Sequence, residues 1–238
     1  MPEAAMIFAA GRGTRMGTLT EKRPKPLIEV AGTTLLDRAL ALADAAGVAR
    51  KVVNIHHLGP MIADHLRRRP GVAISDETEV SEAPLETGGG LKRALPLLGP
   101  GPVFTLNADA VWTGDNPLTR LSRDWDGQRM AALLLLVPLD RARGHRGEGD
   151  FTLGPDRRLT RRAAASAPGL VYTGAQITTT GALARIDENI FSLNRLWDEM
   201  IAGGKLFGCL HEGGWADVGT QEGIAAAEAL LRAEGEDV

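Results

Sequence analysis

The chain is organised around the stretch Phe8-Ala9-Ala10-Gly11-Arg12-Gly13-Thr14-Arg15-Met16-Gly17. An apolar run over residues 4–10 leads into it and predicts a buried strand that ends where the glycines begin. Gly11 and Gly13 allow positive φ and close approach of a ligand to the backbone, because neither has a Cβ. Successive N–H groups in such a turn can bind an anion, and Arg12 and Arg15 add positive charge. The stretch predicts a nucleotide phosphate cradle; on these residues alone, an ordinary strand-to-helix connection is the alternative.

Two familiar glycine motifs do not fit this stretch. A P-loop needs lysine and then a hydroxyl residue after its last glycine, and the chain has no such sequence. The dinucleotide fingerprint needs a small residue where Met16 stands and a helix directly after the loop. The chain instead continues through residues 18–26, where Pro24 and Pro26 prevent a regular helix. We therefore predict a long basic loop that contains Lys25.

Length and composition narrow the class of protein. The 238 residues suit one large α/β domain with a sizeable core. A net charge of −3 and an aromatic share of 4% give no reason to expect a nucleic-acid partner. Cys209 is the only cysteine, so an intrachain disulfide is excluded, and we expect it to be a buried apolar residue. No apolar run has membrane-spanning length and no signal-type segment is present, so we expect a cytoplasmic protein without a membrane partner.

Alternating strand and helix patterns predict the fold class. Thr33 or Thr34 can cap a helix over 35–43, and a second helix starts at Pro60 with Met61, Ile62 and Leu66 facing inward. With short apolar strands at 51–55, 72–75 and 103–106, this alternation predicts a mostly parallel sheet covered by helices on both faces. The later patterns indicate helices over 117–125, 183–186, 193–202 and 220–232, strands over 130–137, 170–179 and 205–210, a hairpin of 151–153 with 158–162, and a mobile loop over 141–150.

Small and polar residues follow several of these strands. In open α/β sheets ligands bind outside the carboxyl ends of the strands, and Asp109 lies at such an end. We therefore expect Asp109 to hold a divalent cation, with a helix cap or turn aspartate as the alternative. His56 and His57 follow another strand and point to opposite sides, which is poor geometry for one metal, so we interpret them as structural or sugar-side residues. The cluster Gly88-Gly89-Gly90 precedes a helix and indicates either close approach of a substrate or a flexible loop.

Together these motifs resemble the sugar-1-phosphate nucleotidylyltransferases. The resemblance rests on Ala9-Ala10-Gly11-Arg12-Gly13-Thr14-Arg15-Met16, Arg23-Pro24-Lys25-Pro26-Leu27, Glu86-Thr87-Gly88-Gly89-Gly90, Asn107-Ala108-Asp109 and Trp215-Ala216-Asp217-Val218-Gly219-Thr220. These pieces follow the family's order through essentially the whole chain. The resemblance implies a Rossmann-like three-layer α/β/α nucleotidyltransferase fold with a mostly parallel central sheet. It also implies a single domain, 1–238, with a nucleotide-binding half (1–110) and a sugar-binding half (111–238).

The resemblance further implies a reaction and its residues. A nucleoside triphosphate and a sugar 1-phosphate would give a nucleoside diphosphate sugar and pyrophosphate, with Mg²⁺ as cofactor. The implied residues are Arg15, Lys25 and Asp109 for catalysis; Asp109 and Asp217 for the metal; Ala9, Ala10, Gly11, Gly13, Thr14, Glu86 and Gly88 for the nucleotide; and Asn107, Gly147, Asp150 and Gly174 for the sugar.

Finer features suggest a branch of this family. The string Pro84-Leu85-Glu86-Thr87-Gly88-Gly89-Gly90 and the segment Gly147-Glu148-Gly149-Asp150-Phe151 are most similar to N-acetylmuramate-1-phosphate uridylyltransferases of peptidoglycan recycling, which implies UTP as the nucleotide. A mannose- or heptose-1-phosphate guanylyltransferase is the alternative within the class, and a non-catalytic nucleotide-sugar sensor is the alternative outside it. The Glu-Lys-Pro motif that many relatives use on the sugar side is absent, and Thr160-Arg161-Arg162 stands in that region. The sequence leaves the oligomeric state open.

Overall fold

A computed structural model describes residues 1–163 and 169–235 of the chain. The strands are β1 (Ala4–Phe8), β2 (Glu29–Val30), β3 (Thr33–Thr34), β4 (Arg50–Ile55), β5 (Val72–Asp76), β6 (Val103–Asn107), β7 (Ala110–Trp112), β8 (Ala132–Pro138), β9 (Ala142–Arg143), β10 (Phe151–Leu153), β11 (Leu159–Arg161), β12 (Leu170–Thr178), β13 (Leu206–Leu210) and β14 (Trp215–Asp217). The α-helices are α1 (Leu35–Ala45), α2 (Gly59–Leu66), α3 (Glu86–Leu98), α4 (Pro117–Asp124), α5 (Asn194–Ala202) and α6 (Gln221–Ala233). Short 3₁₀ helices are η1 (Thr14–Thr20), η2 (Lys25–Leu27), η3 (Glu77–Glu79), η4 (Leu139–Arg141) and η5 (Leu183–Arg185).

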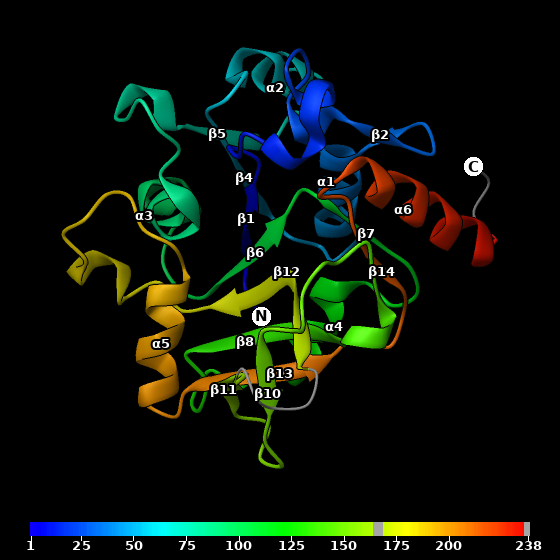
Figure 1. The fold of residues 1–238 in the computed structure, drawn as a ribbon. Helices are drawn as coiled ribbons and strands as arrows, with labels where there is room; N and C mark the ends of the chain where they lie inside the picture. The colour runs from blue at the N-terminus through cyan, green and yellow to red at the C-terminus, as the bar shows by residue number, and fades with distance from the viewer. Residues whose placement is uncertain (164–168, 236–238) are drawn as a thin grey trace.

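The central sheet is mixed, with a parallel amino-terminal half. Strands β5, β4, β1 and β6 are neighbours in that order and pair in parallel, while β12 joins β6 and β8 in antiparallel fashion (Figure 1). The chain moves from β1 outward to β4 and β5 and then returns to the other side of β1 with β6. Such a reversal opens a crevice at the carboxyl ends of the two strands. The segments after Phe8 and Asn107 therefore meet at one edge of the sheet.

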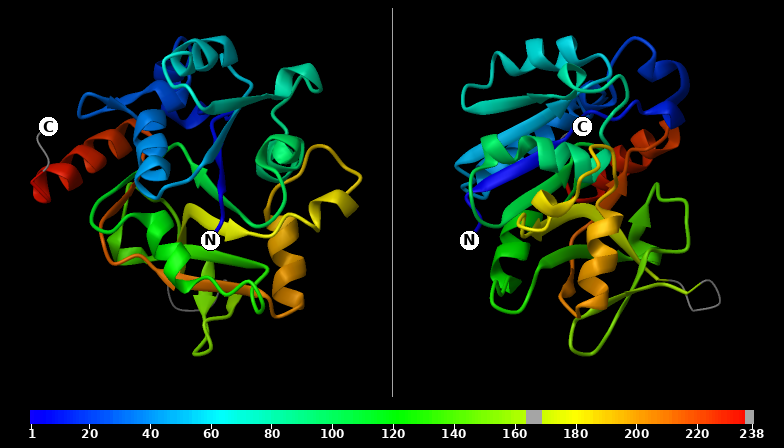
Figure 2. Two further views of the ribbon diagram at one scale, coloured as in Figure 1. Left: turned by 180° about the vertical axis from the view of Figure 1, so that it is seen from behind. Right: turned by 90° about the vertical axis from the view of Figure 1, so that its left-hand side faces the viewer.

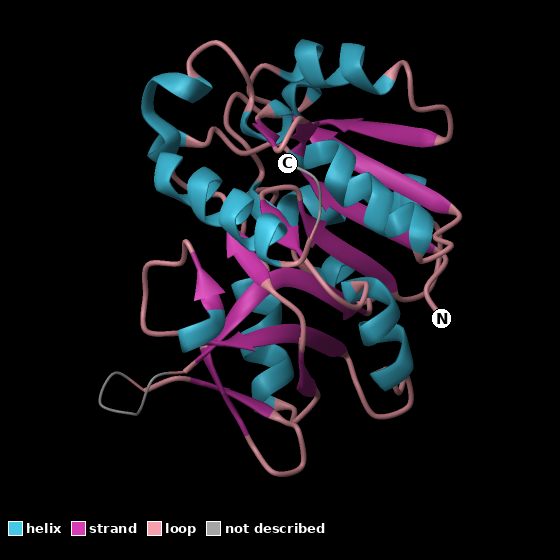
Figure 3. Ribbon diagram, turned by 90° about the vertical axis from the view of Figure 1, so that its right-hand side faces the viewer, coloured by secondary structure: helices cyan, strands magenta, loops and turns pink. Residues whose placement is uncertain are grey.

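Helices cover both faces of the sheet, as the strand–helix alternation predicts (Figures 2 and 3). Because side chains alternate along a strand, Ala5 and Ile7 of β1 pack toward α1, α2 and α4, whereas Ala4 and Met6 pack toward α3 and α5. Thr34 caps α1 by accepting the N–H of Asp37, and Thr220 caps α6 in the same way from Gly223. The fold is thus a three-layer α/β/α arrangement.

A third apolar cluster joins the two ends of the chain. Met16, Val30 and Leu35 pack with Val218 of the β14 segment and Leu231 of α6, so the last helix lies against the first glycine loop and the segment that follows it. In Figure 1 α6 runs beside β7 and β14, close to the blue amino-terminal segments. This packing brings the Asp217 region to the same edge of the sheet as the glycine loop.

The structure corrects the expectation for Met61 and adds local detail to the basic loop and to β12. Met61 was predicted to face inward, but its side chain is exposed, because Ile62 and Leu66 already form the buried side of α2. As predicted, the basic loop forms no regular α-helix; it contains the short 3₁₀ helices η1 and η2, and positive φ at Gly17 interrupts η1. Gly174 takes a φ of +87° and lies where β12 changes register between Tyr172 and Gln176, so β12 continues past this glycine with an irregularity in its pairing.

The glycine cluster is neither a flexible loop nor an open surface. Gly88, Gly89 and Gly90 lie in the first turns of α3 and are buried. A Cβ on Gly88 would be 2.4 Å from the Phe191 ring, and one on Gly89 would be 2.0 Å from the Asn189 carbonyl oxygen. The Phe191 carbonyl accepts the N–H groups of Gly88 and Gly89, at 2.9 and 3.0 Å, and so caps the helix. Close packing of a distant segment explains why these residues are glycines.

Candidate active site

Lys25 and Asp109 form the centre of the site. Their Nζ and Oδ2 atoms are 2.8 Å apart, and the Lys25 side chain is only 9% exposed. The lysine is held in η2 between two prolines, and α1 packs against this turn. Gly13 makes room for it, since a Cβ there would lie 3.0 Å from the Lys25 Cβ, and its φ of +63° suits glycine. Lys25 is therefore a fixed, desolvated cation rather than a solvated loop residue.

Asp217 reaches the same place from the end of β14. Strand β14 pairs with β7 in antiparallel fashion, and the N–H of Val218 donates to the carbonyl oxygen of Asp109 at 2.8 Å. Burial raises the pKa of the Asp217 carboxyl above its ordinary value, and the negative charge of Asp109 raises it further. Lys25 and Arg15 act in the opposite direction, with the Arg15 Nη1 atom 3.8 Å from Asp217 Oδ2. Two carboxylates thus share a partly buried position where a cation would be stabilised.

One cavity of about 200 Å³ opens between the first glycine loop and the start of α3. Its walls include Ala10, Gly11, Glu86 and Thr87, together with Asn107 and Asp109 at the end of β6. Gly11 faces open space, since a Cβ there would meet no atom within 4 Å. Two further lining residues, Asn54 and Glu77, come from the ends of β4 and β5. The cavity is therefore built at the carboxyl ends of the parallel strands.

Asn54 and Glu77 hold this cavity together through buried hydrogen bonds. The Asn54 side chain accepts the N–H of Ala9 at 2.8 Å and donates to Glu77 Oε1 at 2.6 Å. The other oxygen of Glu77 accepts the N–H of Leu85 at 2.8 Å, and Glu77 is fully buried. This chain of bonds ties the end of β1 to the segment before α3, and unpairing either side chain would leave a buried polar group unsatisfied.

A second cavity, of about 380 Å³, continues from the first. Thr87, Asn107 and Asp109 line both cavities, so they form the wall where the two meet. The second cavity is also lined by Arg15, Asp217, Gly174, Asp150 and His145, by the aromatic side chains of Phe151, Tyr172, Trp197 and Trp215, and by Thr173, Ser192, Leu193, Asn194 and Arg161. The Asp150 carboxylate accepts the N–H of Tyr172 at 2.8 Å, which fixes its position in the wall.

Most of the predicted site residues come together around these cavities. Arg15, Lys25, Asp109 and Asp217 converge, Ala10, Gly11 and Glu86 line the smaller cavity, and Asn107, Asp150 and Gly174 line the larger one. A Cβ on Gly174 would lie 2.8 Å from the Asn107 Cβ, which explains this glycine beside Asn107. Within the described part of the chain, Ala9, Gly13, Thr14, Gly88 and Gly147 line neither cavity.

Other singled-out residues have structural contacts. His56 Nε2 lies 3.2 Å from the carbonyl oxygen of Ser81, while His57 Nε2 lies 3.3 Å from that of Thr20, so the two rings point to different elements as expected. Cys209 is buried, as predicted, and burial raises the pKa of its thiol to about 12. Among the residues that the structure describes, no group of three or more acidic, histidine or cysteine side chains could hold a metal ion.

Sequence reasoning missed Asn54, Glu77 and His145. A signal existed for the first two: a polar residue that interrupts a buried apolar strand, or follows it directly, lies at the edge of the sheet where ligands bind. No comparable signal marked His145, which lies in an ordinary loop pattern. Arg161 belongs to the segment that stands where many relatives carry their sugar-side motif, and the fold brings both residues to the larger cavity.

Comparisons with known proteins identify the family of the chain. Residues 5–146 match the family described as the MobA-like NTP transferase domain. The chain is 40% identical to an N-acetylmuramate alpha-1-phosphate uridylyltransferase of Caulobacter vibrioides, over 97% of both proteins. It is 34% identical to a protein of the same name from Neisseria meningitidis serogroup B, over 96% of this chain and 98% of the relative.

A solved structure shares the fold at lower sequence identity. It is a putative glucose-1-phosphate thymidylyltransferase from Bacillus anthracis, which matches with a TM-score of 0.77 at 17% identity, over 96% of this chain and 95% of the other. In the described residues, no helix combines the length and apolar character needed to span a membrane.

Proposed function

The chain belongs to the MobA-like NTP transferase family and is a nucleotidyltransferase, and from this premise we propose that it transfers a uridylyl group from UTP to N-acetylmuramate 1-phosphate. The products would be UDP-N-acetylmuramate and pyrophosphate, within the recycling of peptidoglycan. One observation carries the proposal: Lys25, Asp109 and Asp217 converge beside the wall that two adjoining cavities share. A reaction that joins two ligands needs their binding sites to adjoin in this way, so that the reacting groups are held next to each other.

The two cavities suggest where each substrate binds. The smaller one adjoins the glycine loop and suits the nucleotide, with Ala10, Gly11 and Glu86 around the base and ribose. The larger one, with aromatic side chains, Asn107, Asp150 and Gly174, suits the sugar. Arg15 and the backbone of Gly13 and Thr14, at the start of η1, would contact the β- and γ-phosphates.

In the proposed reaction, the negative charge of both phosphate groups gathers near Lys25. An oxygen of the sugar phosphate attacks the α-phosphorus of the nucleotide, a new P–O bond forms, and the bond to the β-phosphate oxygen breaks as pyrophosphate leaves in line. Such transfers depend on positioning and charge neutralisation rather than on covalent help from the protein. Lys25 would exchange part of its contact with Asp109 for phosphate oxygens and would bring the two negatively charged reactants together.

Asp109 and Asp217 would hold a magnesium ion. The donor set fits this ion, because Mg²⁺ is commonly bound by one or two carboxylates together with substrate phosphates and water. Burial and the charge of Asp109 raise the pKa of Asp217, which means that its negative charge is unfavourable there. A cation between the two carboxylates would offset this unfavourable charge. When bound, the ion would supply neutralisation of phosphate charge.

A matrix of pyrophosphate-release assays tests the proposal. UTP, GTP, CTP and dTTP are each combined with N-acetylmuramate, N-acetylglucosamine and mannose 1-phosphates, with and without Mg²⁺. We expect the highest kcat/KM for UTP with N-acetylmuramate 1-phosphate, and no turnover after chelation of the metal. Preferred turnover of GTP with mannose 1-phosphate would replace this assignment by that of a guanylyltransferase. Nucleotide binding without turnover of any pair would instead support a sensor.

A further inference from the structure

Arg161 lines the larger cavity, and the proposed reaction assigns no role to its positive charge. Besides Arg161, the charged side chains lining that cavity in the described part of the chain are Arg15, Asp109, Asp150 and Asp217, with His145 also present. Arg15 contacts Asp217, so it belongs to the phosphate-transfer centre. Arg161 comes from β11 and has its contacts with β10 and with the start of α5, which lie apart from β7 and β14 (Figure 1). Arg161 therefore presents positive charge to the cavity from a different side.

The guanidinium of Arg161 is held in a fixed position. It lies over the Phe151 ring, 4.9 Å from its centroid, and 5.6 Å from that of Trp197. Its Nε donates to Asp198 Oδ1 at 2.9 Å and its Nη2 donates to the carbonyl oxygen of Asn194 at 3.2 Å. Among the described residues, the Nη1 group has no hydrogen-bond partner. A rigid cation with free donors at a cavity wall is organised to bind an anion.

We propose that Arg161 binds a carboxylate on the sugar, so that the cavity selects an acidic sugar 1-phosphate. The inference rests on the proposed function, which places the sugar in this cavity. The phosphate of that sugar has to lie near Lys25 and Asp109 for the attack, so it cannot at the same time occupy the β10–α5 side. An anion bound by Arg161 is therefore a second one. The planar guanidinium matches a carboxylate, and N-acetylmuramate carries one in its lactyl ether, whereas N-acetylglucosamine has a hydroxyl there.

A pair of sugars and two matched arginine variants test this assignment. The substitution Arg161→Met removes the charge and keeps an apolar chain against the aromatic rings. The control is Arg158→Met on the same hairpin, because Arg158 also lies over an aromatic ring, 5.6 Å from Phe207, and pairs with an aspartate, but does not line the cavity. Dissociation constants of N-acetylmuramate and N-acetylglucosamine 1-phosphates are measured by calorimetry, and KM is measured where turnover allows.

We expect Arg161→Met to weaken binding of the acidic sugar by about 10- to 100-fold, as is usual for a lost charge-assisted hydrogen bond. Binding of the neutral sugar and the KM for UTP should stay within about twofold, and Arg158→Met should change neither. Arg161→Lys should give an intermediate loss for the acidic sugar, because it keeps the charge but not the fork. If Arg161→Met melts early, Arg161→Gln provides the uncharged variant.

Three results would overturn the inference. Equal weakening of both sugars would mean that Arg161 holds the phosphate or the ring, and unchanged binding of both would remove it from the site. An equal effect of Arg158→Met would indicate general electrostatics of the hairpin. All three are distinct from failure of the proposed function, which would show as no turnover of UTP with N-acetylmuramate 1-phosphate by the wild-type protein.

Discussion

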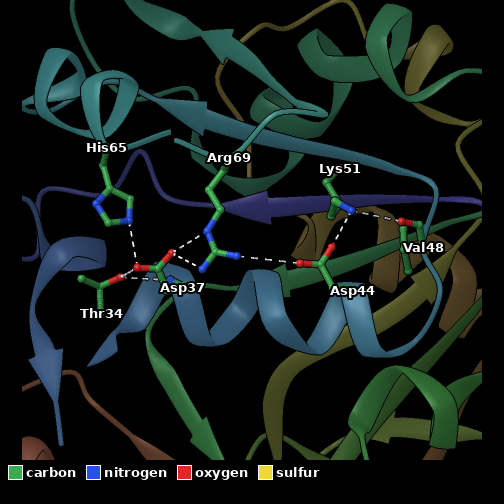
Figure 4. A network of polar contacts seen from close by, with 7 residues as sticks. All are labelled: Thr34, Asp37, Asp44, Val48, Lys51, His65 and Arg69. Atoms are coloured by element: carbon green, nitrogen blue, oxygen red, sulfur yellow. Dashed lines mark hydrogen bonds and ion pairs between the residues drawn. The ribbon is translucent and has the colours of Figure 1, made fainter. Parts of the chain in front are cut away.

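Two charged clusters lie on either side of η2, and the pKa of a carboxylate in each is shifted in the opposite direction. The first cluster, at the proposed active site, contains Lys25, Asp109 and Asp217, and burial and a like charge raise the pKa of Asp217. The second cluster joins α1 to α2 and consists of Asp37 with Thr34, His65 and Arg69. Figure 4 shows the last three side chains converging on the Asp37 carboxylate. Burial acts to raise the pKa of Asp37 as well, but Thr34, Arg69 and His65 outweigh it, and the net shift is downward.

The contacts of Asp37 explain this difference. Its Oδ1 accepts Arg69 Nη2 at 2.7 Å and Nε at 3.1 Å, while its Oδ2 accepts the Thr34 hydroxyl at 2.7 Å and lies 2.9 Å from His65 Nε2. A carboxylate with this many donors is satisfied within the fold. Asp217 has Arg15 only at 3.8 Å and a second carboxylate near by. The Asp217 carboxylate lacks close donors within the fold, so a bound ligand can supply them. A charge left without such partners is typical of a functional site.

Cavity size alone would point to a different part of the molecule. A cavity of about 510 Å³, lined by Leu27, Asp37, His65, Arg69 and neighbouring residues, lies beside the second cluster and exceeds both cavities of the proposed active site. Three of its polar lining residues, Asp37, His65 and Arg69, are already bound to one another. The comparison therefore predicts that substitutions in the first cluster change activity, while those in the second change stability.

The largest effect is expected from Lys25→Met. Removal of the buried cation leaves the developing phosphate charge unopposed, so kcat should fall about a thousandfold or more. Lys22→Met, an exposed residue of the same basic loop, is the matched control and should retain wild-type activity. Pyrophosphate release and thermal melting are measured together. A folded Lys25→Met protein with more than a tenth of the wild-type rate would break the comparison.

Asp217→Asn should separate function from stability. A raised pKa means that the native state binds a proton more readily than the unfolded chain, so this group makes the protein less stable as pH rises through the folded-state pKa. At neutral pH without divalent cations, the asparagine variant should therefore melt higher than wild type, where 1 kcal/mol corresponds to about 2–4 °C. It should also lose about a hundredfold or more in activity.

Added Mg²⁺ sharpens this second prediction. Wild type should melt at a higher temperature with the ion, because a ligand that binds only the native state stabilises it, whereas Asp217→Asn should respond little. If Asp217→Asn melted at a lower temperature than wild type in the presence of chelator, the charge of Asp217 would not be unfavourable in the folded protein, and the prediction would be wrong.

The sequence could predict the parallel half of the sheet, because the apolar runs and helix caps are local signals. The resemblance to the sugar-1-phosphate nucleotidylyltransferases, rather than any local signal, assigned Lys25, Asp109 and Asp217 to one site, because only the fold brings these distant residues together. The sequence could not explain Gly88 and Gly89, because the atoms that a side chain there would meet belong to Asn189 and Phe191, about a hundred residues further on. Such constraints arise only when distant segments pack.

Asp37→Asn should change stability and leave catalysis intact. The variant loses charge-assisted contacts with Arg69 and His65, but both partners are partly exposed, so the free energy of unfolding at neutral pH should fall by only about 1 kcal/mol. Urea unfolding measures this value, and pyrophosphate release should stay within about twofold of wild type. A large loss of activity at unchanged stability would place Asp37 in the functional site and remove the contrast between the clusters.

The smallest and most specific effect is the pH dependence of that stability difference. Because the pKa of Asp37 is lowered by folding, its contribution is present above the ordinary carboxyl pKa of 3.8 and is lost as pH falls through the lower folded-state value. The gap in unfolding free energy between wild type and Asp37→Asn should thus narrow as the pH falls below 4. Asp64→Asn, in an exposed pair with Arg67 on α2, is the control and should show no such gap. A gap that widened below pH 4 would mean that Asp37 is held at a cost, as Asp217 is, and that the two clusters do not differ in kind.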